Sequence, residues 1–145
     1  KPMSFNRLNP QSKSYGPGLS IAYNGSLAAT PFFTAPAACE VIGAKFVNGA
    51  RTSIASAAPA TGTSAVSIVV YKNASGTASR VGSIHNDGTV IGSASTTMGL
   101  NTTTSLLKLA AGDTLWAEVS MGASSASNLA VGWFVQVDLV YGYEN

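Results

Sequence analysis

Apolar side chains recur at every second position in several segments, and this alternation is the feature that most constrains the fold. The longest run places five side chains in one phase: Trp133, Val135, Val137, Leu139 and Tyr141. Residues 42–46, 66–71 and 115–121 carry shorter versions. A period of two puts alternate side chains on one face of a β-strand, whereas a helix repeats at about 3.6 residues. No window shows convincing helical spacing, so the sequence predicts an all-β chain without a helix longer than a turn or two.

Turn-forming residues separate the alternating segments. They occur at four places: Asn24-Gly25, Asn48-Gly49, Asn86-Asp87-Gly88 and Gly112-Asp113. Such residues supply positive φ angles or side-chain bonds to the backbone. Short strands between turns of this kind are typical of β-sandwiches and barrels. A chain of 145 residues has the length of one domain, so we expect a single β-sandwich over residues 18–145.

Residues 1–17 lack the alternation, and the sequence predicts an extended N-terminal arm there. Prolines occupy positions 2, 10 and 17, and proline cannot donate a backbone hydrogen bond to a sheet. The arm contains three bases and no acid. Four of its residues could anchor it in grooves of a partner on a larger particle: Met3, Phe5, Arg7 and Leu8.

The charge content favours a protein that packs against other proteins. Only 10% of residues are charged, compared with about 25% in an average protein, so copies of the chain repel one another weakly. The net charge of +2 is too small to predict nucleic-acid binding. No run of 18 or more apolar residues predicts a membrane span. We therefore expect neither nucleic acid nor membrane insertion.

Few residues could support a cofactor or a metal. His85 is the only histidine, which excludes a multi-histidine metal site within one chain. Together with Asp87 it could form half of a site shared across a trimer axis, although a surface turn is the simpler interpretation. Cys39 is the only cysteine, so no intrachain disulfide can form, and its apolar neighbours predict a buried thiol. The sequence predicts no cofactor and no metal.

The acidic residues offer one weak candidate for catalysis. A glycosidase needs two carboxylates facing one cleft, and Glu118 and Asp138 are the only pair on outward phases of two strands that could be neighbours. No serine lies in a Gly-x-Ser-x-Gly motif, which forms the nucleophile elbow of many hydrolases. We therefore predict that the protein is not an enzyme. A glycosidase remains open only through this pair.

Aromatic residues on the outward phase are the better candidates for function. Trp116 and Phe134 fall opposite the core phase, where a monomer usually places polar groups, and Gln136 follows on the same phase as Phe134. Aromatic residues dominate subunit contacts, so these three residues are predicted to form a subunit interface. Two alternatives stay open. The N-terminal arm could cover this face, or the aromatic side chains could stack against sugars.

Two segments carry a family resemblance. Residues 103–142 combine Leu107 to Leu109, the Gly112-Asp113 corner, an alternating strand and an aromatic-rich final strand from Gly132. They resemble the end of the tumour-necrosis-factor-like jelly roll. The globular heads of complement-type proteins end in the same way. The stretch "SIHNDGTVIGSAST" at Ser83–Thr96 resembles small structural proteins of tailed bacteriophages. The chain has no secretory leader and no collagen-like stalk, which favours the bacteriophage interpretation.

The resemblance implies a function but no site residues. It implies a non-enzymatic virion structural protein, a trimeric jelly-roll unit that decorates a capsid or forms a fibre or tail knob. Its expected partners are two further copies in a homotrimer, other virion proteins and a host cell-surface glycan. The alternative is a non-catalytic carbohydrate-binding module of a secreted protein or fibre.

Overall fold

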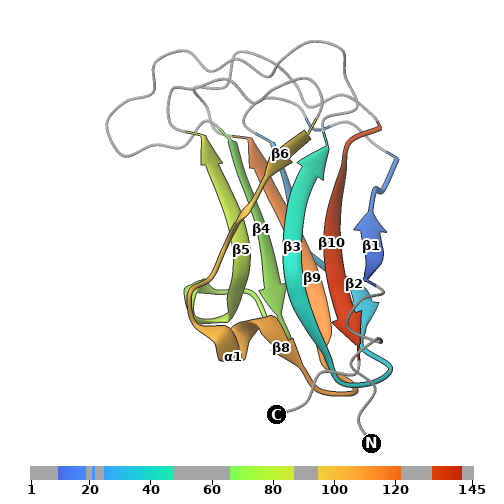
Figure 1. Ribbon diagram of the computed structural model, residues 1–145. Helices are drawn as coiled ribbons and strands as arrows, with labels where there is room; N and C mark the ends of the chain where they lie inside the picture. Colours follow the sequence, from blue (N-terminus) through green and yellow to red (C-terminus); the bar gives the residue numbers. More distant parts are fainter. Residues whose placement is uncertain are drawn as a thin grey trace, which may run out of the picture.

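The computed structural model describes residues 10–18, 21, 25–47, 66–86, 95–121 and 132–141. These residues form antiparallel strands with two short helical turns between them (Figure 1). The elements, in chain order, are β1 (Gln11–Tyr15), β2 (Ser26–Thr34), β3 (Cys39–Val47), β4 (Val66–Lys72), the 3-10 turn η2 (Thr77–Ser79), β5 (Arg80–Asn86), β6 (Ser95–Thr97), β7 (Gly99–Leu100), α1 (Thr104–Leu107), β8 (Lys108–Leu109), β9 (Thr114–Met121) and β10 (Phe134–Tyr141).

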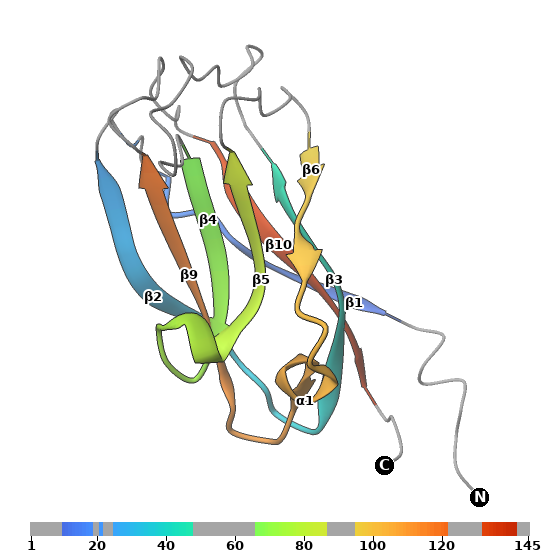
Figure 2. The ribbon, with the colours of Figure 1, turned by 90° about the vertical axis from the view of Figure 1, so that its left-hand side faces the viewer.

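The strands form two sheets that pack face to face (Figure 2). The β10 sheet has the order β1-β10-β3-β6, and β8 also pairs with β3. The β9 sheet has the order β2-β9-β4-β5-β7. Consecutive strands from β1 to β4 therefore alternate between the sheets. This arrangement is that of a jelly-roll sandwich, and the all-β sandwich predicted from the sequence is confirmed.

The core lies between the two sheets and is built from the alternating side chains. In β9 the inward phase consists of Leu115, Ala117, Val119 and Met121, all at most 1% exposed. In β10 the inward phase begins after the buried Trp133 and includes Val135, Val137 and Leu139. Burial of one phase from each sheet is the main contribution to folding, at about 25 cal/mol per Å² of apolar surface. The phases predicted for these two strands are correct.

In β3 the alternation changes phase at a β-bulge. Gly43 pairs with Asp138, but the next pair joins Val41 to Leu139, so Ile42 has no counterpart on β10. One extra residue reverses the direction of every side chain that follows. Ile42 is consequently 49% exposed, although the sequence places it in phase with the buried Phe46. A bulge depends on the partner strand, so the spacing within β3 does not reveal it.

Residues 11–15 correct the prediction for the N-terminal arm. They form β1 and pair with residues 135–139 of β10, so the prediction that residues 1–17 lie outside the sandwich is wrong for this stretch. Tyr15 packs against Trp133 and Phe32, with ring centroids 6.3 Å and 5.8 Å away. Lys13 lies over the ring of Phe33 at 5.7 Å.

The sequence of β1 hides its place in the sheet. Its inward positions are held by a glutamine, a lysine and a tyrosine and its outward positions by serines, so no apolar alternation is visible. A lysine can bury its aliphatic stem and keep its charge at the edge of a sheet. The arm residues Met3, Phe5, Arg7 and Leu8 lie outside the described part of the chain.

The segment 95–107 closes one side of the sandwich. It leaves the β10 sheet after β6, buries Met98 between the sheets, and joins the β9 sheet as β7. It then forms the single turn α1, which contains Leu106 and Leu107. The side-chain oxygen of Asn101 accepts a hydrogen bond from the backbone N–H of Thr103 at 2.8 Å, and this local bond favours a turn at this point.

The opposite side of the β9 sheet ends at β2, an edge strand. Pro31 lies within it, opposite Trp116 of β9, and the pairing shifts register on both sides of this proline. Proline is tolerated in edge strands because its missing N–H faces away from the partner strand. Among the described strands, β2 pairs only with β9.

Tyr15→Ala tests whether β1 contributes to the fold. The substitution removes both aromatic contacts at this edge, so we expect the free energy of unfolding to fall by about 2 kcal/mol. The matched control is Ser14→Ala in the same strand, whose side chain is exposed and whose loss should change stability by less than about 0.5 kcal/mol. Urea unfolding followed by tryptophan fluorescence measures both. Equal stability of the two variants would contradict the placement of β1.

Candidate functional site

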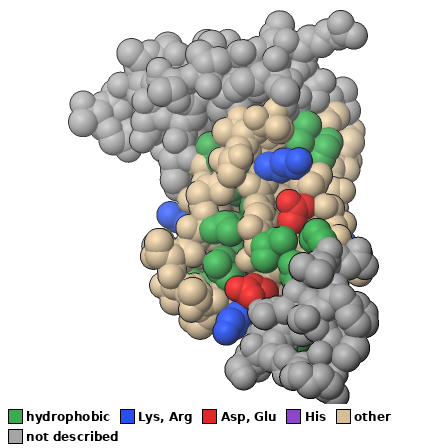
Figure 3. Space-filling view, viewed as in Figure 1, with side chains coloured by type: hydrophobic (Ala, Val, Ile, Leu, Met, Phe, Trp, Pro, Cys, Tyr) green, Lys and Arg blue, Asp and Glu red, His purple; other side chains and the backbone are tan. Residues whose placement is uncertain are grey.

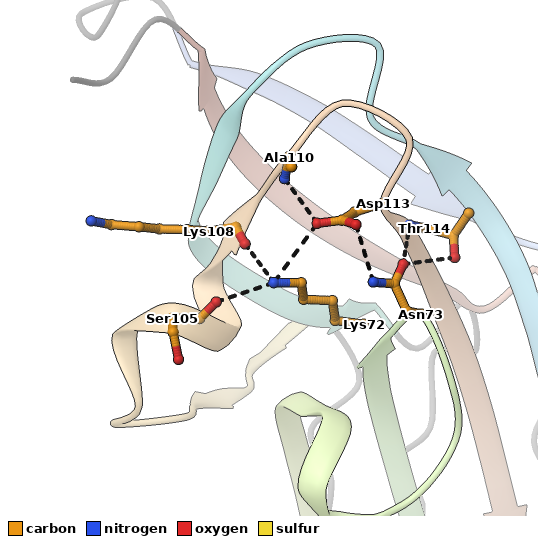
Figure 4. A network of polar contacts seen from close by, with 7 residues as sticks. All are labelled: Lys72, Asn73, Ser105, Lys108, Ala110, Asp113 and Thr114. Carbon is orange, nitrogen blue, oxygen red and sulfur yellow. Dashed lines mark hydrogen bonds and ion pairs between the residues drawn. The ribbon is translucent and has the colours of Figure 1, made fainter. Parts of the chain in front are cut away.

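The Gly112-Asp113 corner carries a dense group of polar contacts at one end of the sandwich (Figure 4). The Lys72 Nζ at the end of β4 donates to the backbone oxygens of Lys108 at 2.8 Å and Ser105 at 3.2 Å. The same Nζ lies 3.7 Å from Asp113 Oδ2. The lysine thus ties α1, β8 and the corner to the β9 sheet.

Asp113 is the acceptor at the centre of this group. Its Oδ2 accepts from the backbone N–H of Ala110 at 2.8 Å, and its Oδ1 accepts from Asn73 Nδ2 at 3.1 Å. Burial by itself would raise the pKa of Asp113. The bonds from Ala110 and Asn73, together with Lys72, outweigh burial and hold the pKa below its ordinary value.

Asn73 completes the corner from the other side. Its backbone has a φ of 67°, in the left-handed region that asparagine tolerates better than most residues. Its Oδ1 accepts from the backbone N–H of Thr114 at 2.8 Å, and its own N–H donates to the Thr114 oxygen at 2.8 Å. The contacts of Lys72, Asn73 and Asp113 all hold chain segments together, so these three residues have a structural role at the corner.

The structure separates the two carboxylates that could have formed a glycosidase pair. Glu118 lies on the outer face of the β9 sheet, where its Oε1 accepts from the Tyr71 hydroxyl at 2.7 Å. Asp138 lies on the outer face of the β10 sheet and accepts from the Ser12 hydroxyl at 2.7 Å. The expectation that their strands are neighbours is wrong, since β9 and β10 belong to different sheets. The two groups face away from each other, so they cannot flank one substrate.

The outer face of the β9 sheet holds a row of large side chains across three strands. Trp116 of β9 lies opposite Tyr71 of β4, and Tyr71 lies opposite Arg80 of β5. Trp116 is half-buried and its Nε1 donates to the Thr114 hydroxyl at 2.9 Å. Tyr71 is only 5% exposed although it lies outside the core cluster. Its neighbours on this face, Trp116 and Arg80 among them, therefore shield it from solvent.

Tyr71 links the two charged residues of this face. Burial raises the pKa of Tyr71, and the hydrogen bond to Glu118 raises it further, while the nearby Arg80 acts in the opposite direction. The phenol therefore stays protonated and donates to Glu118 at neutral pH. Sequence reasoning did not single out Tyr71 or Arg80, because their proximity depends on how β4 pairs with β5.

The outer face of the β10 sheet has a different character. Figure 3 shows this face, on which apolar side chains form several patches and charged side chains are sparse. Phe134 is half-buried at the start of β10. The Gln136 Nε2 donates to Asp138 Oδ1 at 3.0 Å and lies 3.4 Å from the Ser12 hydroxyl. Ile42, exposed by the bulge in β3, lies on the same sheet.

The three predicted interface residues consequently lie on two faces. Trp116 belongs to the outer face of the β9 sheet, whereas Phe134 and Gln136 belong to the outer face of the β10 sheet. The outward phase predicted for all three is correct. A single flat patch that contains all of them is excluded by the sandwich itself.

The remaining sequence candidates add no site. Cys39 is fully buried, as predicted, and burial followed by the negative charge of Asp113 raises the pKa of its thiol. A thiol in this state is a poor nucleophile. The side chain of His85 and the whole of Asp87 lie outside the described residues. In the described ranges, no group of three or more potential metal ligands occurs.

Two surface depressions lie near the row of large side chains and near Phe134. One has a volume of about 300 Å³ and includes Arg80 at the junction of β5 and β7. The other has a volume of about 280 Å³ and lies beside Phe134 between the end of β1 and the start of β10. Among the elements of the described chain, no helix is long and apolar enough to cross a membrane.

No protein-family model matches the chain, and no curated protein matches it in sequence. Among solved structures, a chain from the structure of infectious bursal disease virus, Gx strain, is similar over 94% of this chain, with 10% sequence identity and a TM-score of 0.36. The match covers 33% of that chain, so this chain spans about a third of its length. This is a distant structural similarity to a viral protein, and it does not determine what this chain does.

Asp113→Asn tests the corner through pH. A carboxylate whose pKa is lowered by folding stabilises the native state above its ordinary pKa of about 3.9, and this stabilisation is lost as the pH falls through the lowered value. We therefore expect the variant to be less stable by about 1–2 kcal/mol at pH 7 and to approach the wild type near pH 2.

The control for this experiment is Glu40→Gln, which removes a carboxylate from β3 outside the corner. Urea unfolding at a series of pH values measures the difference between each variant and the wild type. A difference for Asp113→Asn that is the same at pH 7 and at pH 2 would show that its charge does not stabilise the corner.

Proposed function

We propose that this protein is a non-enzymatic structural subunit of a virus particle, which acts by assembling into a homotrimer. The observation that carries the proposal is the position of the outward aromatic residues. Trp116 and Phe134 are each half-buried on opposite outer faces of one sandwich. Large aromatic side chains that a monomer leaves partly exposed are the usual anchors of subunit interfaces.

Contact between two unlike faces closes a ring of three when each copy is rotated by a third of a turn relative to the previous one. In a ring, one surface of each copy packs against a different surface of the next copy, whereas a two-fold dimer uses the same surface twice. The Trp116 face of one copy would pack against the Phe134 face of its neighbour, and a third copy would close the ring. The low charge of the chain reduces the electrostatic cost of bringing these faces together.

The fold supports a structural role without specifying the particle. Jelly rolls are common in viral capsid proteins and in lectins, and both act by binding. We assign no catalytic step to this chain. Its place on a bacteriophage, as a capsid decoration unit or a fibre or tail knob, belongs to the same proposal, as does its location in the virion.

Attachment to other virion proteins is assigned to the residues before β1. Met3, Phe5, Arg7 and Leu8 combine apolar side chains with a positive charge, and they precede the first strand of the sandwich. An extended segment of this composition can insert into grooves of a partner. β1 itself pairs with β10, so the proposed anchor is shorter than the arm expected from the sequence.

Light scattering coupled to size exclusion tests the assembly. The wild type should have three times the monomer mass. Trp116→Ala and Phe134→Ala should each shift the protein toward the monomer, since truncation of an interface anchor typically costs about 2 kcal/mol or more. Leu106→Ala, in α1 and on neither outer face, is the control for loss of a partly exposed apolar side chain.

A mixture of the two variants distinguishes the proposed ring from a symmetric interface. Trp116→Ala keeps an intact Phe134 face, and Phe134→Ala keeps an intact Trp116 face. One productive contact can therefore form between them, and the mixture should contain a heterodimer that neither variant forms alone. A wild-type monomer at micromolar concentration would overturn the assembly proposal.

The second candidate function is a carbohydrate-binding module. Trp116 favours it, because a half-exposed indole next to polar side chains can stack against a sugar ring. A host cell-surface glycan would be the partner in that case. A monomer whose tryptophan fluorescence is quenched by glycan, and no longer quenched in Trp116→Ala, would favour this function over assembly.

A further inference from the structure

The depression beside Arg80 lies at the edge of the β9 sheet, where β7 joins β5. Its volume is about 300 Å³, at the lower end of the range for small-molecule sites. Arg80 is two strands away from Trp116, or about 10 Å at the usual strand spacing of about 4.8 Å. The lining consists of Arg80, Gly82, Ser83, Gly99, Leu100, Asn101 and Thr102.

A glycine keeps the depression open. Gly99 pairs with Ser83 across β7 and β5, and it is exposed. A Cβ at this position would meet only the Ser83 oxygen, at 3.9 Å, so the backbone tolerates a side chain there. A branched side chain at Gly99 would therefore fill the depression without straining the strand.

Arg80 supplies the only charged group of the lining. Its guanidinium is hydrogen-bonded to the Tyr71 hydroxyl, but its Nε is buried without a hydrogen-bond partner, and no ion pair joins it to a described residue. Glu118, the carboxylate of the same face, already accepts from Tyr71. A buried donor without an acceptor is rare and costly. A carboxylate is the acceptor that fits the planar fork of an arginine best.

The other polar groups of the lining fall into two sets. The Asn101 amide is engaged, because its Nδ2 donates to the Arg80 oxygen at 2.8 Å and its Oδ1 accepts from Thr103. It therefore fixes the wall of the depression. Ser83 and Thr102 contribute hydroxyl groups, each able to donate and to accept. Leu100 is the one large apolar side chain in the lining.

We propose that this depression binds one acidic sugar unit, whose carboxylate pairs with Arg80 and whose hydroxyl groups bond to Ser83 and Thr102. The sparse apolar lining disfavours a hydrophobic peptide side chain, and the hydroxyl groups match a ligand rich in hydroxyl groups. The site is formed by one chain. It lies on the same sheet face as Trp116, and it adds a binding activity to the proposed assembly.

Titration of the full chain with D-glucuronate tests the site, with D-glucose as the neutral analogue and acetate as the minimal anion. We expect saturable binding of glucuronate in calorimetry, and NMR shifts concentrated at the backbone amides of Gly82, Gly99 and Thr102. Glucose and acetate should each bind at least about tenfold more weakly, because glucose lacks the carboxylate and acetate lacks the hydroxyl groups.

Two variants remove the site in different ways. Arg80→Met removes the charge, and Gly99→Val fills the depression while the arginine is kept. Each should weaken glucuronate binding by about tenfold or more, whereas Lys45→Met, which removes a cation from the other sheet, should leave it unchanged. Circular dichroism and particle mass, measured on the same samples, separate loss of the site from loss of the fold or of the assembly.

Three results would overturn the proposal. The first is glucose or acetate binding as tightly as glucuronate. The second is unchanged glucuronate binding in Gly99→Val. The third is the absence of NMR shifts at the lining amides of the wild type. Each measurement is repeated on Trp116→Ala, in which the proposed contact over this face is weakened, so the binding proposal and the assembly proposal can fail separately.

Discussion

Burial of one phase of β9 against one phase of β10 is the constraint on which the rest of the structure depends. Each of these strands lies inside its own sheet, and each contributes alternate side chains to the common core. Because the inward phase is fixed by burial, the outward phase is fixed too. The positions of Trp116, Glu118, Phe134 and Asp138 on the outer faces all follow from this one requirement.

Opposite faces, rather than one patch, determine what the protein can do. Residues on the outward phases of β9 and β10 lie on opposite sides of the sandwich. This separates Glu118 from Asp138, and it separates Trp116 from Phe134. The same separation gives each copy two unlike surfaces. Two unlike surfaces are what the proposed head-to-tail contact between copies uses.

The spacing of apolar residues predicts the strands in which one whole phase is buried. It does not predict exposures or contacts that depend on how a strand pairs with its neighbour. The bounds of β9 and the inward phase of β10 follow from alternation alone. The exposure of Ile42 depends on a bulge opposite β10, and β1 is held in place by pairing and by Tyr15 rather than by an apolar pattern. The contact between Tyr71 and Arg80 depends on the register of β4 and β5. None of these can be obtained from the spacing within one strand.

The proline in β2 has a consequence for how copies can join. β2 is a nine-residue edge strand, and a long unpaired edge can recruit the same strand of another copy and grow into a fibril without limit. Pro31 offers no N–H to an incoming strand, and the register shifts beside it disturb the straight ladder that such growth needs. Pairing between the β2 strands of two copies is therefore disfavoured, and the faces of the sheets are left as the surfaces through which copies could pack. A chain with such an edge can reach high local concentration without growing strand by strand.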